Sequence, residues 1–115
     1  TVYNDPISVS QEMTRILKTQ EKCDLIICLS HIGYAYKNDP NKVSDLKLAA
    51  ATRDIDLIIG GHTHTFLDKP TIVKNLDGID TLVNQVGCYG INLGRIDFYF
   101  DTDKNKSHSG RTIVV

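Results

Sequence analysis

The chain has 115 residues, of which 41% are hydrophobic and 23% are charged, and its formal net charge is −1. This length suits one domain, and the composition excludes a disordered protein. The nearly balanced charge gives no electrostatic footprint for a nucleic-acid polymer. The longest apolar run, residues 25–29, is far too short to cross a membrane. We therefore expect neither a nucleic-acid partner nor a membrane span.

The first predicted elements are a helix over about residues 7–21 and a strand over residues 24–30. Asp5-Pro6 is a helix-start signal, and apolar residues then recur at helical spacing. The strand contains a continuous apolar run, which is typical of a strand buried on both faces. His31 follows the carboxyl end of this strand directly.

A polar loop leads to a second helix, predicted over residues 46 to about 53 with Ser44-Asp45 as its cap. The apolar stretch Asp56–Ile59 predicts another buried strand. Residues 24–60 therefore read as a β-α-β unit. Its two strands are expected to lie parallel in one sheet, joined by a right-handed crossover.

The second strand runs into Gly60 and Gly61, and then into His62 and His64. Glycine has no Cβ, so the backbone can turn sharply and approach a neighbour closely. Parallel strands end at the same edge of a sheet, where open α/β sheets bind their ligands. We therefore expect His31, His62 and His64 to converge. Neutral imidazole is the commonest protein ligand of transition metals, so these three histidines are the predicted metal ligands.

After the histidines the pattern changes to short β segments separated by turn signals. The sequence predicts strands over residues 71–74, 80–86, 91–101 and 112–115. We expect them to form a meander or hairpins. Of Asn84 and Gln85, one is expected to face solvent, and a role in supporting a metal ligand is left open for them. His108 is expected to be a solvated surface residue.

The residues Leu29–His31 and Ile58–His64 resemble elements of the second half of a calcineurin-like metallophosphoesterase domain, in the branch of 5'-nucleotidases and UDP-sugar hydrolases. The stretch Asn84–Arg95 also resembles that branch. The resemblance covers nearly the whole chain, and Gly60–His64 is its most specific part. It implies an α/β fold that is part of a four-layer α/β/β/α sandwich, in which the β-α-β unit is followed by mostly antiparallel strands.

The resemblance also implies a hydrolase with two divalent metal ions, which differ between members and include manganese, zinc, iron, cobalt and nickel. By motif position, His31 and His62 would ligate one metal ion and His64 the other. The implied reaction is the hydrolysis of a small phosphate ester, a nucleotide in this branch, by a hydroxide that the two metals activate. Members of the branch are often periplasmic or at the cell surface, so we expect that location.

The sequence lacks the Asp-x-His, Gly-Asp and Gly-Asn-His-Asp/Glu elements of the family's first half. The last of these carries the family's general-acid histidine, so neither a catalytic nor a substrate-binding residue is assigned in this chain. We expect residues 1–115 to be a single partial domain, the C-terminal half of a metallophosphoesterase catalytic domain. Such a chain would be inactive alone and would need the missing N-terminal half.

Two other interpretations stay open at this point. In the first, the chain is a non-catalytic module in which His31, His62 and His64 hold a single metal ion with water as the fourth ligand. In the second, the histidines merely fill the edge of a sheet and bind no metal. Both predict no hydrolysis, and they differ in whether the chain binds a metal ion.

Overall fold

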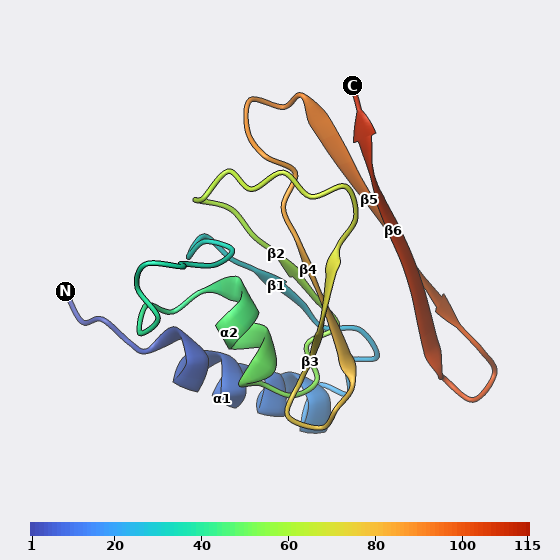
Figure 1. Cartoon of the computed structure of the whole chain (residues 1–115). Coiled ribbons are helices and arrows are strands. Elements are labelled where there is room, and N and C mark those ends of the chain that lie inside the picture. Colours follow the sequence, from blue (N-terminus) through green and yellow to red (C-terminus); the bar gives the residue numbers. More distant parts are fainter.

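The computed structural model describes all 115 residues as a mixed α/β fold, with two helices, a four-stranded sheet and a two-stranded ribbon (Figure 1). The helices are α1 (Pro6–Thr19) and α2 (Asp45–Ala50). The sheet contains, in spatial order, β1 (Ile27–Leu29), β2 (Leu57–Ile59), β4 (Asp80–Asn84) and β3 (Thr71–Lys74). The ribbon pairs β5 (Asn92–Phe100) with β6 (Lys106–Val114).

The sheet has a parallel half and an antiparallel edge. Strand β2 pairs parallel with both β1 and β4, while β3 pairs antiparallel with β4. The predicted β-α-β unit is therefore confirmed. The prediction that β4 belongs to a meander is only half right, because this strand also extends the parallel sheet. As a result, Leu29, Ile59 and Asn84 lie side by side at one edge.

Both helices lie on the same side of the sheet (Figure 1). The Asp5 carboxylate caps α1 by accepting a hydrogen bond from the Ser8 amide at 2.9 Å, and Ser44 caps α2. Helix α1 ends at Thr19, two residues before the predicted end. The core under the helices consists of Ile26, Leu48, Ala49, Ile55, Ile58 and Val83. These side chains come from β2, β4, α2 and the segments that precede the strands.

The ribbon covers the middle of the other face of the sheet. Leu57 and Leu82 lie on that face and are buried, with 4% and 2% of their surface exposed. Two glycines allow the close approach: a Cβ at Gly94 would lie 2.7 Å from Asn84 Nδ2, and one at Gly110 would lie 2.7 Å from Pro70 Cγ. The ribbon therefore forms a further layer on the side of the sheet away from the helices (Figure 1).

One flank of this face carries exposed apolar side chains. Ile27, Leu29 and Ile59 are 47%, 81% and 44% exposed. The prediction that both strands of the β-α-β unit are buried on both faces is therefore wrong for β1 and for the end of β2. Alternate residues of a strand face opposite sides of the sheet. At this corner the helices cover one side, while the ribbon does not reach the other.

Strand β6 is much longer than the predicted segment 112–115. It runs from Lys106 to Val114 and pairs with the whole of β5. His108 is therefore not simply a solvated residue. Its ring lies 6.4 Å from that of Phe98, and its Nε2 lies 3.3 Å from an Asp80 carboxylate oxygen.

An ion pair ties the ribbon to the amino end of the sheet. Lys106 Nζ lies 2.6 Å from Asp56 Oδ1, and the side chains are 27% and 14% exposed. The other oxygen of Asp56 accepts a hydrogen bond from the Ile26 amide at 2.8 Å. Asp56 thus connects the ribbon to the segments that precede β1 and β2.

Neither helix has the length and apolar character of a membrane span.

Candidate functional site

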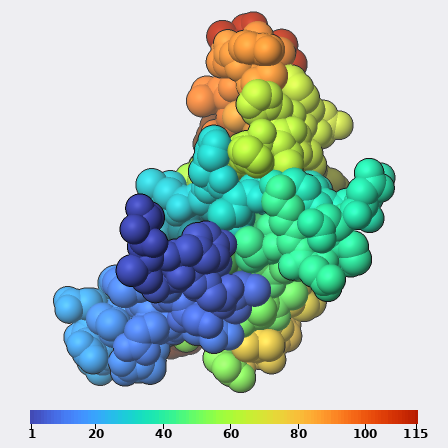
Figure 2. Space-filling view, turned by 90° about the vertical axis from the view of Figure 1, so that its left-hand side faces the viewer, coloured from blue at the N-terminus to red at the C-terminus, as the bar shows by residue number.

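The segments that follow β1, β2 and β4 meet at the carboxyl edge of the sheet. The Ser30 amide donates to the Ile59 carbonyl, and the Gly60 amide donates to the Asn84 carbonyl, both at 2.9 Å. Hydrogen bonding between the strands therefore continues to the residue that precedes His31. Figure 2 shows cyan residues after β1 beside yellow-green residues after β2, with the orange segment after β4 above them.

His31 and His62 come together at this edge. Their ring centroids lie 5.3 Å apart, and the ring planes form an angle of 69°. Gly61 makes this approach possible, because a Cβ there would lie 3.0 Å from His31 Nδ1, tighter than ordinary contact. Both histidines are exposed at the surface of the chain. The sequence predicted this pairing correctly.

His64 does not join this pair. No three His, Cys, Asp or Glu side chains of the chain are placed so that they hold one metal ion together. The backbone turns at His62 and again at His64, which have φ angles of 75° and 52°. This turn brings the His64 ring to 6.5 Å from the ring of Tyr89, in the segment after β4. The three predicted ligands therefore do not form one three-residue cluster, and their assignment to metal ions stays a prediction.

A buried carboxylate lies beneath the edge. Asp45, the first residue of α2, is fully buried, and its Oδ1 accepts a hydrogen bond from the Ser30 hydroxyl at 2.5 Å. Its Oδ2 has no hydrogen-bond partner and lies against Gly60, where a Cβ would overlap it. Burial raises the pKa of Asp45, and the Ser30 hydrogen bond opposes that shift. The sequence assigned Asp45 only to a helix cap, since its contacts come from the tertiary fold.

Both polar residues at the end of β4 are buried. Asn84 and Gln85 are 6% and 3% exposed, so the expectation that one faces solvent is wrong. Asn84 lies under the ribbon at Gly94, and Gln85 lies under the turn 61–65. Alternation along a strand predicts opposite faces, but here each face is covered by a different segment of chain.

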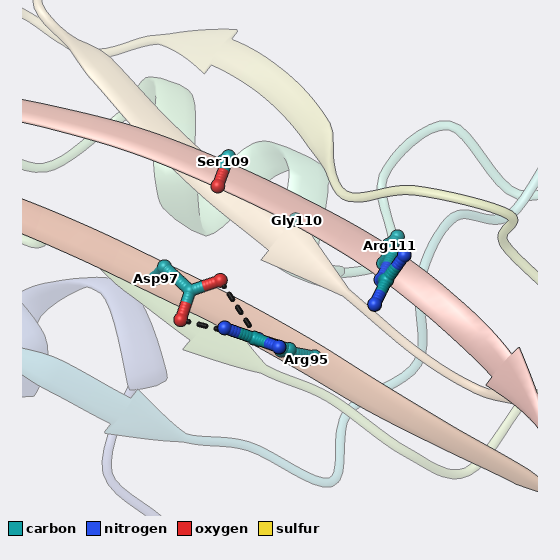
Figure 3. A pocket seen from close by; sticks show the side chains of 5 residues that line it. All are labelled: Arg95, Asp97, Ser109, Gly110 and Arg111. Carbon is teal, nitrogen blue, oxygen red and sulfur yellow. Dashed lines mark hydrogen bonds and ion pairs between the residues drawn. The ribbon is translucent and has the colours of Figure 1, made fainter.

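A hollow lies on the outer face of the ribbon (Figure 3). It encloses about 300 Å³ and is lined by Arg95, Asp97, Ser109, Gly110 and Arg111. Arg95 bonds with Asp97 on its own strand, and Arg111 lies opposite Arg95 on β6. None of the edge histidines lines this hollow, so it is separate from the candidate site.

The residues at the edge fit part of a transition-metal site. Imidazole nitrogens suit transition metals such as zinc, iron and nickel, and the exposed pair His31 and His62 comes from two adjacent strand ends. Two side chains do not complete the coordination shell of such an ion. The arrangement therefore fits a site that takes its other ligands from elsewhere.

No family model matches the chain. The chain is 43% identical over 100 residues to the trifunctional nucleotide phosphoesterase protein YfkN of Bacillus subtilis. This match covers 87% of this chain and 6% of that protein. It is 34% identical over 118 residues to an apyrase of Tabanus yao, in a match that covers 90% of this chain and 20% of that protein. The chain thus spans a small part of the relatives it matches.

Two solved structures are similar over 98% of this chain. The first is a 5'-nucleotidase precursor from Thermus thermophilus, with a TM-score of 0.82, 29% identity and 23% of that structure covered. The second is an NAD nucleotidase of Haemophilus influenzae, with a TM-score of 0.77, 24% identity and 24% covered. The second likeness concerns the fold alone.

Proposed function

Because this chain belongs to the 5'-nucleotidase branch of the metallophosphoesterases and spans only part of its relatives, we propose that it supplies part of a metal-dependent nucleotide phosphoesterase centre. The observation that carries the proposal is the pair of exposed imidazoles, His31 and His62, with centroids 5.3 Å apart at the carboxyl edge. Such an edge is where α/β enzymes place their ligands.

In this proposal His31 and His62 hold one divalent metal ion, and His64 contributes to a second. When bound, the two metals would supply Lewis-acid stabilisation of a phosphoryl group and would acidify a water molecule. The separation of His64 from the pair is compatible with two ions, and it disfavours the alternative in which all three histidines hold one ion. The role of the chain is to hold these imidazoles on adjacent strand ends.

We place the rest of the catalytic domain against the exposed apolar flank of the sheet. Leu29 is 81% exposed there, next to the strand end that carries His31. An apolar sheet face gains stability when another layer covers it, at about 25 cal/mol per Å² of apolar surface. A covering segment at Ile27, Leu29 and Ile59 would reach the histidine edge and supply the remaining ligands. This is the N-terminal half of the four-layer sandwich that the resemblance implies.

The proposed substrate is a small nucleotide phosphate ester, since the similar proteins are named as nucleotide phosphoesterase, apyrase and 5'-nucleotidase. Metal identity is left open among manganese, zinc, iron, cobalt and nickel. One similar structure is described as a precursor. The periplasmic or cell-surface location stays a prediction.

The test measures phosphate release from 5'-AMP and bis(p-nitrophenyl) phosphate in manganese, with and without chelator. The chain is assayed alone and fused behind the segment that precedes the matched region in the Bacillus subtilis relative. We expect chelator-sensitive hydrolysis only from the fusion. His62→Ala should abolish it, while His108→Ala, a histidine of the ribbon outside the site, should retain it. A fusion that binds two metal ions and hydrolyses no phosphate ester would refute the proposal.

A further inference from the structure

The turn that carries His62 and His64 is bracketed by one buried side chain, Gln85. Its Nε2 donates to the Gly61 carbonyl at 2.8 Å, and its Oε1 accepts from the Thr65 amide at 2.9 Å. Gln85 is 3% exposed and stands just past the end of β4. We propose that Gln85 is a positioning residue that fixes the two histidines for metal binding, an inference that rests on the proposed function.

The turn needs such support because of its backbone. His62 and His64 both have positive φ angles, which non-glycine residues rarely adopt unless the surrounding structure holds them there. Both histidines are exposed, so burial of the rings does not fix their conformation. The Gln85 bonds attach the residue before His62 and the residue after His64 to the rigid sheet.

The same amide connects the turn to the segment after β1. Thr63 Oγ1 lies 3.4 Å from Gln85 Oε1 and 3.3 Å from its Nε2. That hydroxyl also bonds to Thr65 Oγ1 at 2.8 Å and accepts from the Tyr34 amide at 3.0 Å. Tyr34 lies three residues after His31. The network therefore couples the placement of His62 to the segment that carries its partner His31.

Position 85 requires an amide side chain, because this side chain must donate to the Gly61 carbonyl and accept from the Thr65 amide. A glutamine offers both, whereas an ionised glutamate only accepts and a methionine does neither. The room for this side chain comes from Gly60, where a Cβ would lie 3.3 Å from Gln85 Cγ. In known sites, mutation of the residues that hold metal ligands in place by hydrogen bonds lowers metal affinity about 10–100-fold.

The test compares Gln85→Met, which keeps the length of the side chain and removes both hydrogen bonds, with Thr81→Val. Thr81 lies in β4 itself, is fully buried, and donates to the Ile55 carbonyl at 2.8 Å near the opposite end of that strand. Both variants are made in the fusion described under the proposed function, which supplies the remaining ligands. We measure amide hydrogen exchange of Thr65 in the metal-free fusion and its affinity for Zn²⁺ by calorimetry. Gln85→Met should speed Thr65 exchange about tenfold and weaken zinc binding 10–100-fold. Thr81→Val should lower the melting temperature and change neither.

Unchanged Thr65 exchange in Gln85→Met would overturn the inference without reference to any metal. Faster exchange with unchanged zinc affinity would also overturn it, since the turn would then be loosened without effect on its ligands. A wild-type fusion whose zinc binding is absent, or is not weakened by His62→Ala, would instead refute the proposed function. In that case the purpose assigned to Gln85 falls with it.

Discussion

The Gly60→Ala substitution tests how the sheet edge is packed. A methyl group at Gly60 would overlap Asp45 Oδ2 and would lie 3.1 Å from Asp45 Cγ and 3.3 Å from Gln85 Cγ. The φ of Gly60 is not in the left-handed region, so the cost is one of space and not of backbone conformation. Asp45 is fully buried and bonded to Ser30, so it cannot simply swing into solvent.

The magnitude follows from these contacts. Overfilling a packed interior costs about 1–3 kcal/mol. If Asp45 moves and loses its bond to Ser30, a charge-assisted hydrogen bond worth about 1.5–3 kcal/mol is lost as well. We expect Gly60→Ala to lower the free energy of unfolding by roughly 1–6 kcal/mol, with the upper part of the range reached only if the bond to Ser30 is lost. Urea unfolding followed by circular dichroism measures this change.

A double-mutant cycle isolates the cause. Asp45→Ala removes the carboxylate that a methyl at Gly60 would strike, so Gly60→Ala should cost much less in that background, with a coupling above about 0.5 kcal/mol. The matched control is Gly78→Ala. A Cβ there meets nothing within 4 Å, and only the positive φ of 73° adds strain of about 1–2 kcal/mol. Additive effects of Gly60→Ala and Asp45→Ala would refute the steric explanation.

Two further predictions concern the ion pairs that hold the ribbon and the β3–β4 edge. The hydrogen bond from Lys74, with a further contribution from His108, holds the pKa of Asp80 below its ordinary value. Asp80 therefore stabilises the fold above about pH 4 and loses that effect as the pH falls through its folded-state pKa. We expect Asp80→Asn to be less stable than wild type at pH 7. The difference in their urea unfolding midpoints should shrink as the pH is lowered. Lys106→Met should lower the free energy of unfolding by more than the ~0–1 kcal/mol of an exposed ion pair and by less than the ~3–5 kcal/mol of a fully buried one. The reason is that the substitution leaves the largely buried Asp56 carboxylate without its ion-pair partner. Chemical denaturation measures this change.

Both predictions have a clear counter-result. If the stabilities of Asp80→Asn and wild type differ by the same amount from pH 7 to pH 2.5, protonation of this carboxylate does not affect the free energy of unfolding. For Lys106→Met the control is Arg15→Met, which breaks a pair with Glu12 whose side chains are 54% and 58% exposed. That variant should leave the unfolding free energy nearly unchanged, because solvent screens an exposed ion pair. An equal loss from both variants would contradict the role given to partial burial.

Local signals in the sequence determined the elements whose causes are themselves local. Asp5 and Ser44 cap their helices, as the residue types and positions predict. Apolar runs located β1 and β2, although the first is covered on only one face. Strand β6 was mostly missed, because Ser107–Gly110 has no apolar alternation and becomes a strand only by pairing with β5.

The sequence also determined that His31 and His62 meet, because parallel strands end at one edge. Only the tertiary structure decided that His64 lies apart, since that depends on two left-handed backbone positions within one turn. Packing likewise decided the contacts of Asp45 and Gln85, because their partners are 15 and 20–24 residues away in the chain. A residue's type and spacing fix what it can bond, whereas packing alone fixes which group is brought within reach.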